Sequence, residues 1–319
     1  MKLIDSLNDN QKAAVLHTEG PLLILAGAGS GKTRVITHRI AYLITQKMTP
    51  PRSIFAVTFT NKAAEEMRTR VAGLIGPTGR DAFIKTFHSA SVHILRRHGS
   101  RLGIGSSFSI YDRSDQEALI KELLEESRLD PKIIKPSSIA SKISEIKEKA
   151  EYLQESDPSL LFPQTYTFDF ADFFGRYQRS LEKHNALDFN DLLIKTVELF
   201  REHPEALQSL QGLWRYFMID EYQDTNYAQY LIARFLASES KNICVVGDDD
   251  QSIYSWRGAD IRNILNFEHD YRDAKVVVLE ENYRSREPIL EAAAHVIRNN
   301  ARRKNKTIRA CRGEGEPVV

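Results

Sequence analysis

The sequence predicts an α/β fold with a mostly parallel sheet. Short β-rich runs alternate with helical patterns along most of the chain, and the first run leads into a glycine-rich turn followed by a helix. The β-rich runs cover residues 22–25, 54–59, 83–87, 216–219, 243–246 and 276–279. Strands that alternate with helices form parallel sheets covered on both faces, so we expect ligands at the carboxyl ends of the strands.

Residues 111–187 lack strand signals and carry amphipathic helical patterns at 116–127, 139–153 and 168–184. Prolines between the first two patterns, Pro131 and Pro136, mark a connecting loop. We therefore expect an inserted all-helical subdomain.

Composition excludes several classes of protein. A length of 319 residues is enough for about two domains. With 44 Lys and Arg against 43 Asp and Glu, the formal charge is +1, so a nucleic-acid surface would have to be a local patch. Two cysteines argue against a disulfide framework, and no apolar run is long enough to span a bilayer. We expect a cytoplasmic protein without a membrane partner.

The glycine-rich turn at residues 25–33 has the pattern of a triphosphate-binding loop. Its glycines let backbone N–H groups face the phosphates, and the helix that follows favours anions at its N-terminus. Lys32 is placed to reach the β and γ phosphates, and Thr33 to ligate Mg²⁺. Ala26 stands where the strict pattern has glycine, and it fits there if its φ angle is negative.

Two adjacent carboxylates follow the apolar run at residues 216–219. Asp220, at the strand tip, is suited to holding the Mg²⁺ that bridges the β and γ phosphates, and Glu221 to orienting and deprotonating the attacking water. An isolated Asp-Glu pair is usually a solvated turn, but the preceding strand and the phosphate loop favour the catalytic interpretation.

A second acidic segment, residues 246–258, follows the run at 243–246. In this segment the Gln251 amide is placed to contact the γ phosphate. Trp256, five residues later, would face a partner other than the nucleotide. The three aspartates at 248–250 lack the glycine and the terminal glutamate of a calcium loop. Packing in the core is the alternative for Trp256.

Residues 284–312 hold nine basic and two acidic side chains. A solvated helix with a basic tail and a nucleic-acid contact are both compatible with this pattern.

Seven segments, in this order, resemble the motifs of superfamily 1A DNA helicases, the group that contains Rep, UvrD and PcrA. They are residues 7–11 (the Q motif), 26–33 (I), 58–64 (Ia), 86–89 (Ib), 220–224 (II), 251–258 (III) and 282–285 (IV). The resemblance implies a RecA-like P-loop ATPase that uses ATP and Mg²⁺ and moves 3′ to 5′ along DNA. It also implies that single-stranded and partially duplex DNA are the partners, in DNA replication or repair.

The resemblance assigns ATP contacts both inside and outside the phosphate loop. Gln11 would read the adenine edge, and Tyr283 and Arg34 would sandwich the ring. Arg284 would stabilise charge on the γ phosphate, with a surface ion pair as the alternative. The ATP-binding set is Gln11, Gly27, Ala28, Gly29, Ser30, Gly31, Lys32, Thr33, Arg34, Tyr283 and Arg284, with Lys32, Glu221, Gln251 and Arg284 as catalytic residues and Thr33 and Asp220 as metal ligands.

For DNA, the resemblance points to Phe59, His88 and Trp256, with Tyr254 and Arg257 as weaker candidates. Aromatic stacking tolerates any base, as a translocating enzyme requires. Core packing is the alternative for Phe59, because it ends a β-rich run.

The resemblance also implies a domain plan. Residues 1–110 and 188–282 would form a RecA-like ATPase domain (1A), residues 111–187 a helical insertion (1B), and residues 283–319 the start of a second RecA-like domain (2A). Family members continue into motifs V and VI, which supply a further arginine to the ATP site. Because this sequence stops at Val319, we expect an N-terminal part of the motor with little or no activity of its own.

Two other functions remain open. A P-loop phosphotransferase would need a small-molecule substrate pocket, and it leaves the aromatic residues of segments 58–64 and 251–258 unexplained. A nucleotide-dependent DNA-binding module without motor activity would bind ATP but show no DNA-stimulated turnover.

Overall fold

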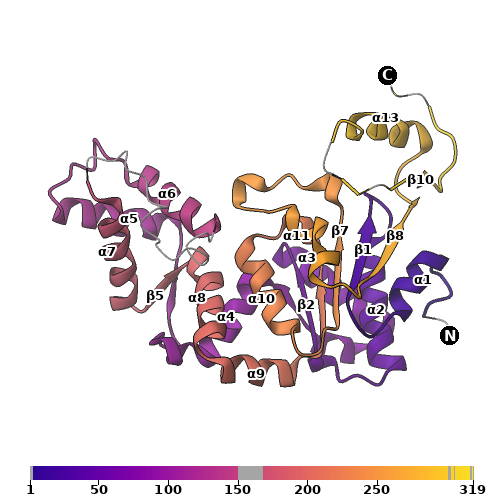
Figure 1. Cartoon of the computed structure of the whole chain (residues 1–319), viewed down its shortest axis with the longest axis horizontal. Coiled ribbons are helices and arrows are strands. Elements are labelled where there is room, and N and C mark those ends of the chain that lie inside the picture. Colours follow the sequence, from indigo (N-terminus) through magenta and orange to yellow (C-terminus); the bar gives the residue numbers. More distant parts are fainter. Residues whose placement is uncertain (1–2, 150–167, 301–302, 305, 317, 319) are drawn as a thin grey trace. The chain divides into compact units, whose positions relative to one another are not determined.

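The computed structural model describes residues 3–149, 168–300, 303–304, 306–316 and 318. The chain forms two compact units (Figure 1). Unit 1 consists of Met1–Phe87, Gln208–Thr225 and Ala233–Val319, and unit 2 of His88–Leu207 and Asn226–Ile232. The division into domains 1A, 1B and 2A stays a prediction.

A six-stranded sheet forms the centre of unit 1. Its strands are β1 (Leu22–Ala26), β2 (Ile54–Thr58), β3 (Phe83–Thr86), β6 (Tyr216–Ile219), β7 (Ile243–Gly247) and β8 (Lys275–Leu279). Their order is β3-β2-β6-β7-β1-β8, and all neighbours are parallel. Each strand lies at one of the predicted β-rich runs, so the predicted α/β fold class is confirmed.

Both faces of this sheet are covered, as buried parallel strands require. On one face, alternate strand residues such as Ile24 join Ile40 and Met67 in a single buried cluster. The helices on this face are α1 (Asp9–Leu16), α2 (Lys32–Gln46) and α3 (Asn61–Ile75). On the other face, Phe55 packs on Trp214, with ring centroids 4.7 Å apart. Polar groups of the strand-ending loops are therefore left at the edges of the sheet.

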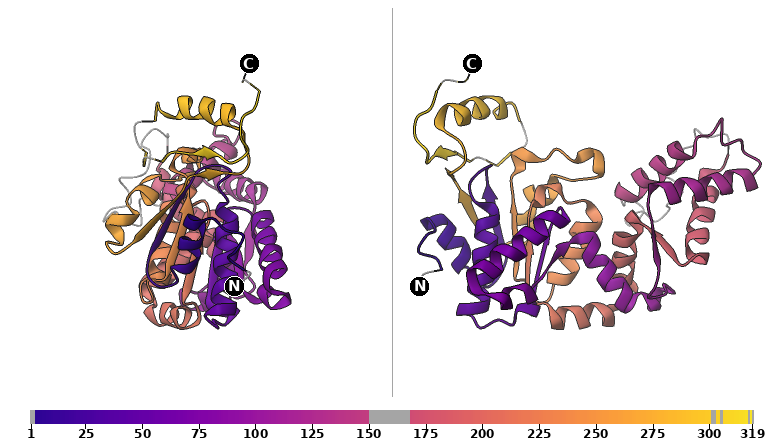
Figure 2. Two further views of the ribbon diagram at one scale, coloured as in Figure 1. Left: turned by 90° about the vertical axis from the view of Figure 1, so that its right-hand side faces the viewer. Right: turned by 180° about the vertical axis from the view of Figure 1, so that it is seen from behind.

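The remaining elements of unit 1 are short, apart from one helix near its end. They are η1 (Pro51–Ser53), η2 (Pro77–Asp81), η6 (Tyr222–Asp224), η7 (Asp249–Gln251), η8 (Ser255–Arg257), α11 (Arg262–Leu265), α12 (Phe267–Asp270), β9 (Glu281–Asn282), α13 (Glu287–Ile297) and β10 (Arg309–Ala310). Both α13 and β10 lie beyond the carboxyl end of β1 (Figures 1 and 2). The helices α9 (Pro204–Leu213) and α10 (Tyr227–Ala237) each have several residues in both units.

Unit 2 is mostly helical. Its elements are α4 (Phe87–His98), η3 (Gly99–Leu102), β4 (Ser109–Tyr111), α5 (Arg113–Glu126), α6 (Pro136–Lys149), α7 (Phe170–Lys183), β5 (Ala186–Asp188) and α8 (Phe189–Glu202). The three expected helices are α5, α6 and α7, although residues 150–153 of the second prediction lie outside the described chain. None of the described helices in either unit combines the length and apolar composition needed to cross a membrane.

The expectation of an all-helical region at 111–187 differs from the structure at its two ends. There β4 and β5 form a parallel pair, with Ile110 opposite Leu187. A strand of three residues is too short to show a periodicity of two, so its sequence carries no strand signal.

A charged cluster lies in the core of unit 2. Lys147 Nζ donates hydrogen bonds to Asp188 Oδ2 at 2.5 Å and to Asp191 Oδ1 at 2.7 Å. Tyr177 OH donates to the same Asp188 oxygen at 3.1 Å, and all four residues are buried. Burial raises the pKa of Asp191 despite the opposing charge of Lys147. The ammonium therefore compensates carboxylates that have lost their water.

Lys147→Met should leave these two carboxylates buried without their cation. We expect the free energy of unfolding at pH 7, measured by urea titration, to fall by about 3–5 kcal/mol. The folded-state pKa of Asp191 is raised, so as the pH falls this carboxyl takes up a proton in the folded protein before it does so in the unfolded chain. The stability lost in Lys147→Met should therefore shrink towards pH 5.

Lys121→Met is the matched control, because Lys121 forms an exposed pair with Glu125 at 3.9 Å. Its effect should stay below about 1 kcal/mol. Equal losses in the two variants, or a Lys147→Met loss that grows in acid, would contradict this account.

Candidate nucleotide and nucleic-acid site

The phosphate loop joins the carboxyl end of β1 to the first turn of α2. Gly29 and Gly31 have φ angles of +72° and +90°, which glycine adopts without steric strain. Ala26 ends β1 and is outside the group of residues with positive φ, so its methyl group is tolerated. Ser30 Oγ donates to Gly27 O at 2.7 Å and closes the turn. The backbone therefore has the shape of an anion-binding loop.

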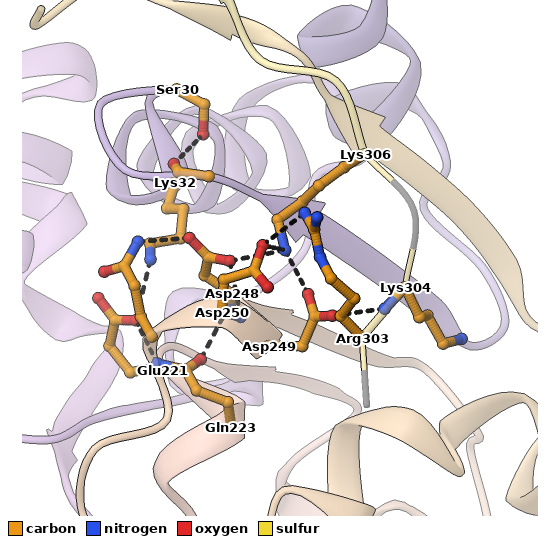
Figure 3. A network of polar contacts seen from close by, with 12 residues as sticks. Ser30, Lys32, Glu221, Gln223, Asp248, Asp249, Asp250, Arg303, Lys304 and Lys306 are labelled. Atoms are coloured by element: carbon orange, nitrogen blue, oxygen red, sulfur yellow. Dashed lines mark hydrogen bonds and ion pairs between the residues drawn. The ribbon is translucent and has the colours of Figure 1, made fainter. Parts of the chain in front are cut away.

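Lys32 and Glu221 form an ion pair next to this loop (Figure 3). Lys32 Nζ, in the first turn of α2, lies 3.1 Å from Glu221 Oε2. Glu221 follows β6 and has a left-handed backbone, with φ +51° and ψ +48°. This turn places a carboxylate beside the lysine that the sequence assigns to the β and γ phosphates.

Asp220 and Asp224 are carboxylates with raised pKa values. Burial, together with the charge of Glu221, raises the pKa of Asp220 to about 7 and that of Asp224 to about 6. Asp224 Oδ1 is buried and has no hydrogen-bond partner among the described residues. Carboxylate oxygens in this state fit a hard divalent cation such as Mg²⁺. Thr33, in the first turn of α2, adds a hydroxyl that is suited to the same role.

Gln223 connects the two acidic segments and is absent from the residues chosen by sequence. Its Nε2 donates to Glu221 Oε2 at 3.0 Å and to Asp224 Oδ2 at 3.1 Å. Its Oε1 accepts from the N–H of Asp248 at 3.0 Å. A Cβ atom at Gly247 would lie 2.6 Å from this Oε1, so any larger residue there would have to displace the Gln223 amide. The buried amide therefore ties the end of β6 to the end of β7.

Gln251 lies at the end of η7, where its Nε2 donates to Asp248 Oδ2. The carboxylates of Asp248, Asp249 and Asp250 are close enough together to share a cation. The Lys306 ammonium lies among them, 2.8 Å from Asp248 Oδ1 and 2.8 Å from Asp250 Oδ2 (Figure 3). A lysine thus provides the positive charge at this position.

The residues assigned to adenine contact the phosphate loop or the start of α1. Gln11 is buried, and its Nε2 donates to Ser30 O at 3.1 Å while its Oε1 accepts from Asn8 N at 3.2 Å. Tyr283 N–H donates to Gly29 O at 3.0 Å. Arg34 is exposed, and its guanidinium donates to the carbonyl and hydroxyl oxygens of Ser6. Because both ends of the Gln11 amide are engaged, adenine would have to share or replace these bonds.

The turn at residues 282–285 is fixed to the phosphate loop by Asn282, a second residue that the sequence-based set omits. Asn282 Nδ2 donates to Ala28 O at 2.5 Å, and its Oδ1 accepts from the N–H groups of Arg284 and Ser285. A Cβ atom at Gly29 would lie 2.6 Å from the Cβ of Arg284. Arg284 therefore lies against the loop at its Cβ atom, although the residue as a whole is exposed.

Three of the residues assigned to DNA belong to one aromatic group in unit 1. Phe59 stacks on Tyr254 with centroids 4.9 Å apart, and Tyr254 contacts Trp256 at 6.3 Å. Phe59 is 38% exposed and Trp256 is 69% exposed. The core-packing alternative is therefore wrong for Trp256. The side chain of Arg257 lies outside the described part of the structure.

A second stacked pair lies in unit 2. The rings of His88 and Phe189 are 4.1 Å apart and inclined by 26°. Burial lowers the pKa of His88 to about 4, so the imidazole is neutral at pH 7 and offers an aromatic face without charge. Phe189 is 54% exposed and was not chosen from the sequence. His88 and Phe189 lie far apart in the sequence, so no local pattern indicates that the two rings meet.

Comparison with known proteins identifies a helicase family that matches most of this chain. Residues 7–272 match the UvrD/REP helicase N-terminal domain. The protein named ATP-dependent DNA helicase PcrA from Bacillus subtilis (strain 168) is 50% identical over 314 residues, which are 98% of this chain and 42% of that protein. PcrA from Staphylococcus aureus (strain Mu50) is 48% identical over 316 residues, 99% of this chain and 43% of the relative.

This chain therefore spans less than half the length of these relatives. The family match nevertheless covers most of its 319 residues, including the phosphate loop, both acidic segments and the exposed aromatic group of unit 1. The chain belongs to the UvrD/REP helicase family and contains its RecA-like N-terminal domain.

Proposed function

We propose that this chain carries the ATP site and part of the single-stranded DNA track of a 3′ to 5′ DNA helicase, a cytoplasmic motor of DNA replication or repair. The main support is the Lys32–Glu221 pair at 3.1 Å. The lysine proposed to bind phosphate and the proposed base thus lie together at the carboxyl edge of a parallel sheet, where such folds bind ligands. The similar PcrA proteins are named as ATP-dependent DNA helicases.

In the proposed reaction, Lys32 exchanges its contact with Glu221 for the β and γ phosphates of ATP. Glu221 is then free to accept the proton of the water that attacks the γ phosphorus. Thr33 and Asp220 would hold Mg²⁺, which neutralises charge on the phosphate oxygens when bound. Arg284 would add positive charge as the transition state forms.

Coupling to DNA would run through the segment after β7. Gln251 and Trp256 are five residues apart in this segment, so a γ phosphate at the amide can change the position of the indole. Bases would stack on Trp256 and on the Phe59–Tyr254 pair, and His88 would provide a further uncharged face. Stacking does not depend on base identity, which suits movement along any strand.

ATP turnover with and without oligo-dT tests this proposal directly. We expect oligo-dT to raise turnover, and Glu221→Gln to bind ATP normally but lose about 100-fold or more of the turnover, because the amide cannot accept a proton. Glu239→Gln, a carboxylate change outside the site, should behave like the parent. ATP binding without DNA stimulation would favour a DNA-binding module, and transfer of phosphate to a small molecule would favour a phosphotransferase.

Lys32→Ala should abolish Mg·ATP binding or weaken it by about 100-fold or more, because it removes charge-assisted contacts to two phosphates. Isothermal titration would measure the affinity, and circular dichroism would check the fold. Lys47→Ala, just beyond the other end of α2, is the control and should leave the affinity unchanged. Normal affinity in a folded Lys32→Ala variant would refute the phosphate-loop assignment.

Trp256→Ala should weaken binding to oligo-dT by about 1–3 kcal/mol, the usual contribution of one stacked base. Fluorescence anisotropy at several salt concentrations should show the same salt slope as the parent, since no phosphate contact is lost. Met48→Ala, which also shortens an exposed apolar side chain, should have no effect. Unchanged affinity for DNA in Trp256→Ala would remove this residue from the DNA track.

A further inference from the structure

Lys306 connects the chain after α13 to the loop that carries Gln251. Its side chain is only 2% exposed and forms ion pairs with Asp248, Asp249 and Asp250. The main chain reinforces this contact, because the N–H of Lys304 donates to Asp249 Oδ2 at 2.6 Å. The segment is therefore held against the loop by buried charges.

Asp248 is the link between Lys306 and Gln251. One carboxylate oxygen, Oδ1, faces the Lys306 ammonium at 2.8 Å and accepts from the N–H of Asp250 at 3.1 Å. The other oxygen, Oδ2, accepts from the Gln251 amide. The backbone N–H of the same residue is held by Gln223 at 3.0 Å. The orientation of the Gln251 side chain thus depends on a carboxylate whose other oxygen is paired with Lys306.

Lys306 is the cation that pairs with all three aspartates, and Arg303 adds a second ion pair to Asp250 at 2.9 Å. Three carboxylates lie close together here, and like charges in a site with little water repel strongly. Burial alone would lower the pKa of Lys306, but hydrogen bonds to the three aspartates raise it above its ordinary value. Without the ammonium, Asp248 Oδ1 would lose its ion-pair partner, and the carboxylate that holds the Gln251 amide would no longer be fixed in orientation.

We propose that Lys306 is a positioning residue for Gln251: it fixes the Asp248 carboxylate, which in turn holds the amide ready for the γ phosphate. The inference rests on the proposed ATP site. Its consequence is specific, because ADP has no γ phosphate for Gln251 to contact. The lysine should therefore contribute to the preference for ATP over ADP and leave the phosphate-loop contacts common to both nucleotides unchanged.

The test compares a non-hydrolysable ATP analogue with ADP by isothermal titration, in the parent chain and in Lys306→Met. We expect the analogue to bind about tenfold more weakly in the variant, as for loss of one charge-assisted hydrogen bond, and ADP to bind within twofold of the parent. Lys306→Arg should recover part of the preference. Lys304→Met is the control, because that side chain pairs with the exposed Glu268 and leaves the three aspartates their lysine.

A double variant separates positioning from general stability. In a Gln251→Ala background, Lys306→Met should no longer change the ratio of the two affinities. Equal weakening of both nucleotides, or no change in either, would overturn the proposal. If Lys306→Met fails to fold in a thermal melt, Asp248→Asn decides instead, since it keeps the side-chain shape but removes the ion pair. An unchanged ratio in Asp248→Asn would likewise refute the positioning role.

These outcomes are distinct from failure of the ATP site itself. If the parent chain bound neither nucleotide, or bound both normally after Lys32→Ala, the proposed function would fail. If nucleotide binding depends on Lys32 but the ratio of the ATP-analogue and ADP affinities is the same with and without Lys306, only the positioning role is refuted.

Discussion

The parallel pairing of six strands directs the strand-ending loops of unit 1 to one edge of the sheet. The phosphate loop, Glu221 and the loop before Gln251 follow β1, β6 and β7 at that edge. Because both faces of the sheet are buried, polar side chains can gather only where the strands stop. They then satisfy one another, and this explains why Lys32, Glu221 and Gln223 form a continuous network.

The strands were predictable because their signal is local. Four of them, β1, β2, β6 and β7, are buried along their whole length, and such strands are continuous apolar runs in the sequence. The phosphate loop is equally local, since its shape depends on Gly29 and Gly31 adopting positive φ. By contrast, the β4–β5 pair depends on residues that are far apart in the chain, and its three-residue strands have no pattern of their own.

The site was predictable only as a set of motifs, and the roles given to its residues remain predictions. Gln223 meets its partner Asp248 across 25 residues, and Asn282 meets Ala28 across 254. Sequence spacing does not predict contacts between residues so far apart in the chain. The basic segment at residues 284–312 shows the same limit. Its composition left open whether it is solvated or binds nucleic acid, and in the structure Lys306 and Arg303 are paired with aspartates of the loop after β7. Net charge describes a segment, but it does not identify partners.

The backbone of Glu221 has a consequence for how this site can change. Its left-handed conformation is one that glycine or asparagine adopts with less strain, by roughly 1 kcal/mol, than a residue with a longer side chain. The fold and the chemistry proposed for Glu221 thus favour different amino acids at the same position. Replacing Glu221 with glycine would relieve this strain but would remove the proposed base, so at this position a gain in stability and the proposed activity exclude each other.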